Sequence, residues 1–171
     1  MQRYVIAVLV NNQFGVLARV AGMFRRRGFN IDTLTVGETE NPKFSRMTIS
    51  FYGDDASRKQ VISQLSKLSD VRAVHQIDKD NAVMRELVLI KIRNTPETQP
   101  EIVTVTDIFR ARVVDYGRER MTIEITGETS KVNAFIDNMK KYGIIELCRT
   151  GIVAIERGAD YLLTDHESTE E

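Results

Sequence analysis

The sequence has few of the residues from which catalytic and metal sites are built. It contains one cysteine, Cys148, and two histidines, His75 and His166, and it has no Cys-x-x-Cys or His-x-x-x-His motif. A nucleophilic triad needs a Ser or Cys beside a positioned His. Glycine-rich phosphate loops and acidic calcium loops are also absent. These absences argue against an enzyme and against a dedicated metal site, and we expect Cys148 and His75 to be structural.

Long hydrophobic runs and an excess of either charge are lacking as well. The longest apolar run near the N-terminus, residues 5–10, is too short for a signal sequence or a membrane span. Lys and Arg number 24, and so do Asp and Glu, so no net charge attracts the chain to nucleic acid or lipid. A single cysteine forms no internal disulfide, which fits a reducing compartment. We therefore expect a cytoplasmic protein that binds neither nucleic acid nor membrane.

Two segments of the chain repeat each other. Residues 46–49, Arg-Met-Thr-Ile, recur 74 positions later as residues 120–123. The same offset places Gly53 on Gly127 without a gap. Two copies of one module explain this better than chance does.

Each copy shows the order strand, helix, strand, strand, helix, strand. Apolar residues 4–10 predict a buried central strand, and Val16, Val20 and Phe24 at helical spacing predict the helix after it. The expected strands are residues 4–10, 31–36, 44–52 and 71–77 in the first copy, and 86–92, 111–115, 120–126 and 144–156 in the second, the last broken at Gly151. This βαββαβ order places both helices on one face of a sheet, which is the ferredoxin-like α+β fold.

The expected domains are residues 1–80 and 81–163, followed by a flexible acidic tail of residues 164–171. In the third strand of the first domain, apolar residues alternate with Thr48 and Ser50. We expect one face of that strand to contact helices and the other to be more polar.

The loop before the first helix carries the most informative residues. Gly15 permits a tight turn that opens the first N–H groups of the helix, and such a helix N-terminus attracts a carboxylate. Asn12 offers both a donor and an acceptor, and Asn30 offers a second amide. A simpler interpretation is that Gly15 only makes the turn and Asn12 only caps the helix. The second copy has no matching glycine in residues 94–97, so only the first is predicted to bind a ligand.

Two stretches of the chain resemble a known family. Residues 8–20, VLVNNQFGVLARV, resemble the opening of an ACT domain. Residues 24–36, FRRRGFNIDTLTV, with residues 45–49, SRMTI, are similar to the small regulatory subunit of acetohydroxyacid (acetolactate) synthase. The resemblance covers nearly the whole chain and is looser in the second copy. It implies an N-terminal ACT domain and a related C-terminal domain.

The resemblance implies a function and a partner. The family's catalytic large subunit uses thiamine diphosphate and Mg²⁺, with FAD as an optional further cofactor, to join two pyruvates or pyruvate and 2-ketobutyrate. The small subunit, itself non-catalytic, activates this transferase and confers feedback inhibition by valine or a related amino acid in valine, isoleucine and leucine biosynthesis. It binds no cofactor, and this chain lacks the Gly-Asp-Gly…Asn-Asn motif for thiamine diphosphate.

In the family, ACT domains pair as a homodimer and the ligand lies between two protomers. The resemblance therefore implies a site formed by residues of two chains: Asn12, Gly15, Val16 and Leu17 of one chain with Asn30 and Ile31 of the other. One alternative is a free-standing amino-acid sensor that regulates another enzyme or a transcription factor, although no helix-turn-helix pattern is visible. Another is a purely structural oligomerisation module, in which Asn12 and Gly15 would have no special role.

Overall fold

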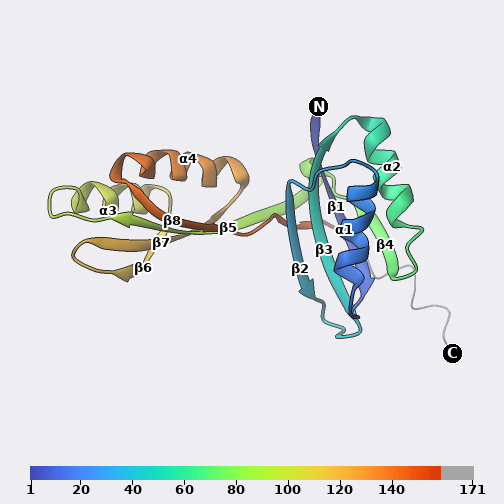
Figure 1. Cartoon of the computed structure of the whole chain (residues 1–171). Coiled ribbons are helices and arrows are strands. Elements are labelled where there is room, and N and C mark those ends of the chain that lie inside the picture. Colours follow the sequence, from blue (N-terminus) through green and yellow to red (C-terminus); the bar gives the residue numbers. More distant parts are fainter. Residues whose placement is uncertain (159–171) are drawn as a thin grey trace. The chain divides into compact units, whose positions relative to one another are not determined.

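The computed structural model describes residues 1–158, which form two compact units (Figure 1). The first unit consists of Met1–Val83 with residues 151–158, and the second of Met84–Thr150. The expected tail of residues 164–171, including His166, lies outside the described residues.

The first unit is a four-stranded antiparallel sheet in the order β2-β3-β1-β4. Its elements are β1 (Gln2–Asn11), α1 (Val16–Arg26), β2 (Thr33–Glu38), β3 (Phe44–Gly53), α2 (Asp55–Leu65), β4 (Val71–Gln76) and the 3₁₀ turn η1 (Lys79–Asn81). In Figure 1, α1 and α2 lie on one face of this sheet. The βαββαβ order predicted from the sequence is confirmed.

The second unit repeats the arrangement with the strand order β6-β7-β5-β8. Its elements are β5 (Ala82–Arg93), α3 (Gln99–Ile108), β6 (Arg112–Tyr116), β7 (Arg120–Gly127), α4 (Thr129–Met139), the 3₁₀ turn η2 (Lys140–Tyr142) and β8 (Ile144–Arg149). Helix α4 begins and ends 74 residues after α2, which is the offset of the sequence repeat. Cys148 lies in β8 as a free, exposed thiol.

Each unit has its own core between the helices and one face of the sheet. In the first unit Val16, Val20, Met23 and Phe24 of α1 are all buried, because their spacing places them on one side of the helix. In the second unit Phe135 of α4 is fully buried among residues of β5 and β7. The helical periodicity in the sequence therefore located both cores.

The first sheet is also covered on the face that its helices do not contact. Val5, Ala7 and Leu9 of β1 point away from the helices, and yet each is at most 2% exposed. On the same face of β3, Thr48 and Ser50 are buried too. The prediction of a more polar face is right about residue type, but this face does not meet solvent.

A strap formed by residues 151–158 supplies this cover. It contains the short strand β9 (Val153–Glu156). Ile152 and Ala154 are buried, whereas Val153 and Ile155 are more than half exposed. This alternation gives the strap an apolar side that faces the sheet.

Polar contacts fasten the strap to successive strands. Arg46 of β3 donates from Nη2 to the Ala154 carbonyl at 2.7 Å. In β4, His75 Nε2 lies 2.7 Å from Glu156 Oε2, and the backbone N–H of Asp78 donates to the other carboxylate oxygen at 2.7 Å. His75 is thus a hydrogen-bonded strand residue, as expected.

The strap changes the domain boundaries expected from the sequence. The sequence predicts a second domain of residues 81–163, but the second unit begins at Met84 and ends at Thr150, and residues 151–158 pack with the first unit. The expected break near Gly151 is present. Beyond it the chain returns to the first sheet, because that sheet has a second apolar face to bury.

Gly151→Ala should weaken the first unit. A Cβ at this position would lie 2.6 Å from Thr35 Oγ1 and 3.0 Å from the backbone of Leu34, so the strap would have to lift away from β2. Overpacking of this kind costs about 1–3 kcal/mol, and urea unfolding measures it. Gly37→Ala in β2, where no atom lies within 4 Å of the added Cβ, is the matched control and should change stability little. Equal effects of the two substitutions would contradict the contact.

The Glu156 carboxylate should make the first unit sensitive to acid. Hydrogen bonds from the Asp78 N–H and from His75 lower the pKa of Glu156 below its usual 4.5. The carboxylate therefore stabilises the fold fully above its unfolded pKa, and this contribution is lost as the pH falls through the lower folded value.

Glu156→Gln should be less stable than the wild type at pH 6, by roughly 1.5 kcal/mol for charged hydrogen bonds. It should also lose less stability than the wild type between about pH 5 and 3. Urea unfolding across this range provides the comparison. Parallel pH curves for the two proteins would exclude Glu156 as the titrating group.

Candidate functional site

The loop predicted as a binding element joins β1 to α1 at one end of the first sheet. β1 ends at Asn11 and α1 begins at Val16. Between them Gly15 adopts φ 81°, in the left-handed region that glycine enters without a steric penalty. This conformation makes the tight turn predicted from the sequence.

The N-terminus of α1 is open to a ligand. Gly15 occupies the N-cap position and has no side chain to accept from the following N–H groups, and the first turn contains no acidic residue. The N–H groups of Leu17 and Ala18, at the second and third helical positions, therefore lack the usual capping oxygen. Backbone donors and the positive end of the helix dipole favour an anionic group here.

Asn12 is fixed beside this helix end by two hydrogen bonds. Its backbone N–H donates to the Lys43 carbonyl at 2.8 Å, and its side-chain Nδ2 donates to the Pro42 carbonyl at 3.0 Å. The side chain is exposed. The simpler interpretation, that Asn12 caps α1, does not describe this geometry, because its amide binds the turn before β3 and leaves Oδ1 as an acceptor.

Apolar groups of the loop divide between the core and the surface. Val16 is 3% exposed and packs in the core, so its side chain does not line an open site. Leu17 is 46% exposed, and Phe14 is fully exposed. These two side chains are available to contact an aliphatic group.

Asn30 and Ile31 lie beyond the other end of α1. The helix contains 11 residues, so about 16 Å separates its two ends. Asn30 is exposed, and Ile31 packs in part against the core. A single chain therefore does not bring these two residues together with Asn12, Gly15 and Leu17.

Sequence reasoning missed Arg19 and Asp70. Arg19 Nε donates to Asp70 Oδ2 at 2.5 Å, and Arg19 Nη1 lies 3.1 Å from the point that a Cβ on Gly15 would occupy. The ion pair holds a cation beside the open helix end. The four-residue spacing of Gly15 and Arg19 was the available signal, because residues so spaced are neighbours on a helix surface.

The described residues offer little else for chemistry. In residues 1–158, no group of three or more His, Cys, Asp or Glu side chains is placed to hold a metal ion. None of the helices described is long and apolar enough to cross a membrane.

Comparisons with known proteins agree over both units. Residues 6–73 match the family described as AHAS small subunit-like ACT domain, and residues 85–158 match the small subunit of acetolactate synthase. The chain is 56% identical over 156 residues to a probable acetolactate synthase small subunit of Archaeoglobus fulgidus, covering 91% of this chain and 98% of the relative.

Two further relatives carry the same description. The acetolactate synthase small subunit of Mycolicibacterium smegmatis is 43% identical, with 91% of each chain covered. A crystal structure of the acetolactate synthase small subunit from Thermotoga maritima superposes with a TM-score of 0.87 at 43% identity, covering 94% of this chain and all of that one.

Gly15→Ala should destabilise the protein because of its backbone conformation. A residue with a Cβ in the left-handed region costs about 1–2 kcal/mol, whereas Asn tolerates it better. Gly15→Asn should therefore lose less than Gly15→Ala. Thermal unfolding of both variants provides the measurement.

Gly22→Ala is the control within the same helix. Its added Cβ would make only an ordinary contact with the Arg26 side chain, at 3.5 Å, and alanine should raise stability by about 0.5–1 kcal/mol. An increase of this size for Gly15→Ala would show that Gly15 is not held in the left-handed region.

Proposed function

Because the chain belongs to the family of acetolactate synthase small subunits, we propose that it is a non-catalytic regulatory subunit. It binds a branched-chain amino acid, valine or a relative of it, and transmits feedback inhibition to a catalytic large subunit. In the same assembly it raises the activity of that subunit. Thiamine diphosphate, Mg²⁺ and any FAD would belong to the large subunit. The observation that carries the proposal is the open N-terminus of α1 beside the fixed amide of Asn12.

The loop offers a group for each part of an amino acid. The N–H groups of Leu17 and Ala18 point out of the helix end and suit a carboxylate. The cation of Arg19 adds to the positive potential there. The Asn12 side chain already donates to Pro42, so its Oδ1 suits the ammonium. Exposed Leu17 suits a short aliphatic side chain.

A second copy of the chain would complete the site. Asn30 and Ile31 are too far along α1 to reach a ligand held by Asn12 of the same chain. In a homodimer with antiparallel α1 helices, the Asn30 end of one helix meets the Asn12 end of the other, and the ligand lies between them. The homodimer is therefore part of the proposal.

Inhibition then results from differential affinity. A ligand between two protomers stabilises the arrangement of the dimer that it fits best, and it alters catalysis only as far as the large subunit distinguishes the arrangements. Couplings of this kind are typically about 1–3 kcal/mol. This range corresponds to a change in effector affinity of about 5- to 150-fold.

Asn30→Ala should weaken inhibition because it removes an amide from the far wall of the site. The experiment titrates valine against acetolactate formation by the chain reconstituted with its large subunit. We expect the half-inhibitory concentration to rise about tenfold, which corresponds to about 1.4 kcal/mol. Valine at 100 times its dissociation constant should stabilise the isolated wild-type chain by about 2.7 kcal/mol, and the variant by less.

Asn138→Ala is the matched control. Asn138 is an exposed asparagine of α4 in the second unit, where its amide donates to the Ala134 carbonyl. It should leave the valine titration unchanged. Acetolactate formation by the isolated chain would contradict the non-catalytic role, and equal inhibition of wild type and Asn30→Ala would place the effector elsewhere.

A further inference from the structure

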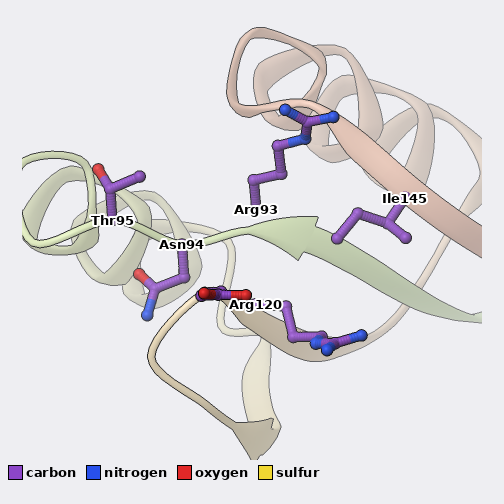
Figure 2. Close-up of a pocket in the computed structure, with 6 residues that line it drawn as sticks. Arg93, Asn94, Thr95, Arg120 and Ile145 are labelled. Atoms are coloured by element: carbon purple, nitrogen blue, oxygen red, sulfur yellow. The ribbon is translucent and has the colours of Figure 1, made fainter.

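The second unit contains a cleft at the end of its sheet where β5 ends and the chain continues to α3. Its volume is about 390 Å³, within the size range of small-molecule sites. The residues that line it come from the end of β5, the start of β7 and the start of β8: Arg93, Asn94, Thr95, Glu119, Arg120 and Ile145 (Figure 2). None of these residues belongs to the proposed effector site.

The cleft occupies the same place in its unit as the Asn12 loop does in the first. Asn94 donates its backbone N–H to the Glu119 carbonyl, just before β7, at 2.9 Å, and its Nδ2 to the Gly117 carbonyl at 3.0 Å. Asn12 makes a similar pair of bonds to the turn before β3, with the carbonyls of Lys43 and Pro42. The two asparagines therefore make comparable bonds at the ends of the central strands of the two units.

The surroundings of the two asparagines differ. Asn94 is 3% exposed, and within residues 1–158 its Oδ1 has no hydrogen-bond partner. A buried acceptor in this state is unfavourable until a donor reaches it. Because Oδ1 is enclosed and a carboxylate has no proton to donate, the ligand proposed below does not depend on Asn94.

Two arginines occupy opposite positions on neighbouring strands at this cleft. Arg93 of β5 is the register partner of Arg120 of β7, so both side chains leave the open face of the sheet from paired positions. Neither guanidinium forms an ion pair within the described part of the chain. Like charges in opposite positions destabilise a sheet unless an anion lies between them. Glu119 lines the same cleft, and the local charge remains positive.

Ile145 gives the cleft an apolar wall. In Figure 2 the guanidinium groups of Arg93 and Arg120 extend to either side of the Ile145 side chain. Ile145 is 49% exposed. An oxyanion with a short hydrocarbon part satisfies both features, because arginine binds a carboxylate through paired N–H donors and the hydrocarbon part covers Ile145.

We propose that this cleft is a second ligand site, and that it binds a small aliphatic carboxylate through Arg93 and Arg120. The site is independent of the proposed effector site, because it lies in the other unit and needs no second copy of the chain. Its ligand is distinguished from a free phosphate by the contact with Ile145.

The experiment titrates isobutyrate into the full-length chain labelled with ¹⁵N and monitors each backbone amide. We expect saturable shifts at residues 93–95 and 119–120, and binding at least tenfold weaker for the neutral isostere isobutyramide. Because the readout is resolved by residue, binding near residues 12–17 is counted separately. Failure of the proposed function therefore leaves this test intact.

Arg93→Gln and Arg120→Gln should each weaken isobutyrate binding at least tenfold. Arg118→Gln is the matched control, since Arg118 is exposed in the same turn but does not line the cleft, and it should weaken binding less than twofold. Removing one of two opposed cations should also leave the melting temperature at or above that of Arg118→Gln. A lower melting temperature for both cleft variants would assign the arginines a structural role and overturn the proposal.

Inorganic phosphate and Ile145→Ser test the aliphatic contact. Ile145→Ser should weaken isobutyrate binding severalfold and leave phosphate unaffected. If phosphate binds the wild type as tightly as isobutyrate does, the assignment to an aliphatic carboxylate is wrong. Absence of shifts at residues 93–95 and 119–120 with isobutyrate would remove the site altogether.

Discussion

The apolar character of both faces of β1 is the constraint on which the first unit depends. A sheet covered by helices on one side usually presents polar residues on the other, but Val5, Ala7 and Leu9 are nearly inaccessible to solvent. A second layer has to cover them, and the strap of residues 151–158 provides it with buried Ile152 and Ala154. Because that layer comes from the far end of the described chain, the first unit is discontinuous in sequence.

This constraint also limits where the first unit can bind anything. Helices α1 and α2 cover one face of its sheet, and the strap covers the other. The surfaces that remain are the ends of the sheet, its edges and the outer sides of the helices. The loop of Asn12 and Gly15 lies at such an end, and its exposed polar groups are free of any packing role there. The placement of the proposed effector site thus depends on how the rest of the unit buries its apolar surface.

Much of this architecture could be predicted from the sequence, and there are physical reasons why the rest could not. Strand and helix periodicity located the elements because burial on one side imposes a fixed spacing. The 74-residue repeat identified the two copies, and the turn at Gly15 was recognised from one glycine. The strap was missed because residues 144–156 read as one interrupted strand, and which sheet its second half covers is decided by long-range packing. A signal was present in residues 4–10. Side chains on both faces of this strand are apolar, so both faces have to be covered by other parts of the protein.

The two asparagines show how a repeated fold can keep a position while its chemistry changes. Asn12 and Asn94 tie the end of the central strand to the turn before the third strand, and this bond is structural in both units. In the first unit the residues around it are a left-handed glycine and an uncapped helix, which present backbone donors. In the second, helix α3 starts after Thr98, and the donors come instead from side chains, Arg93 and Arg120. The shared tie fixes the geometry of the sheet end, so the groups proposed to bind an anion around it can differ between the two copies.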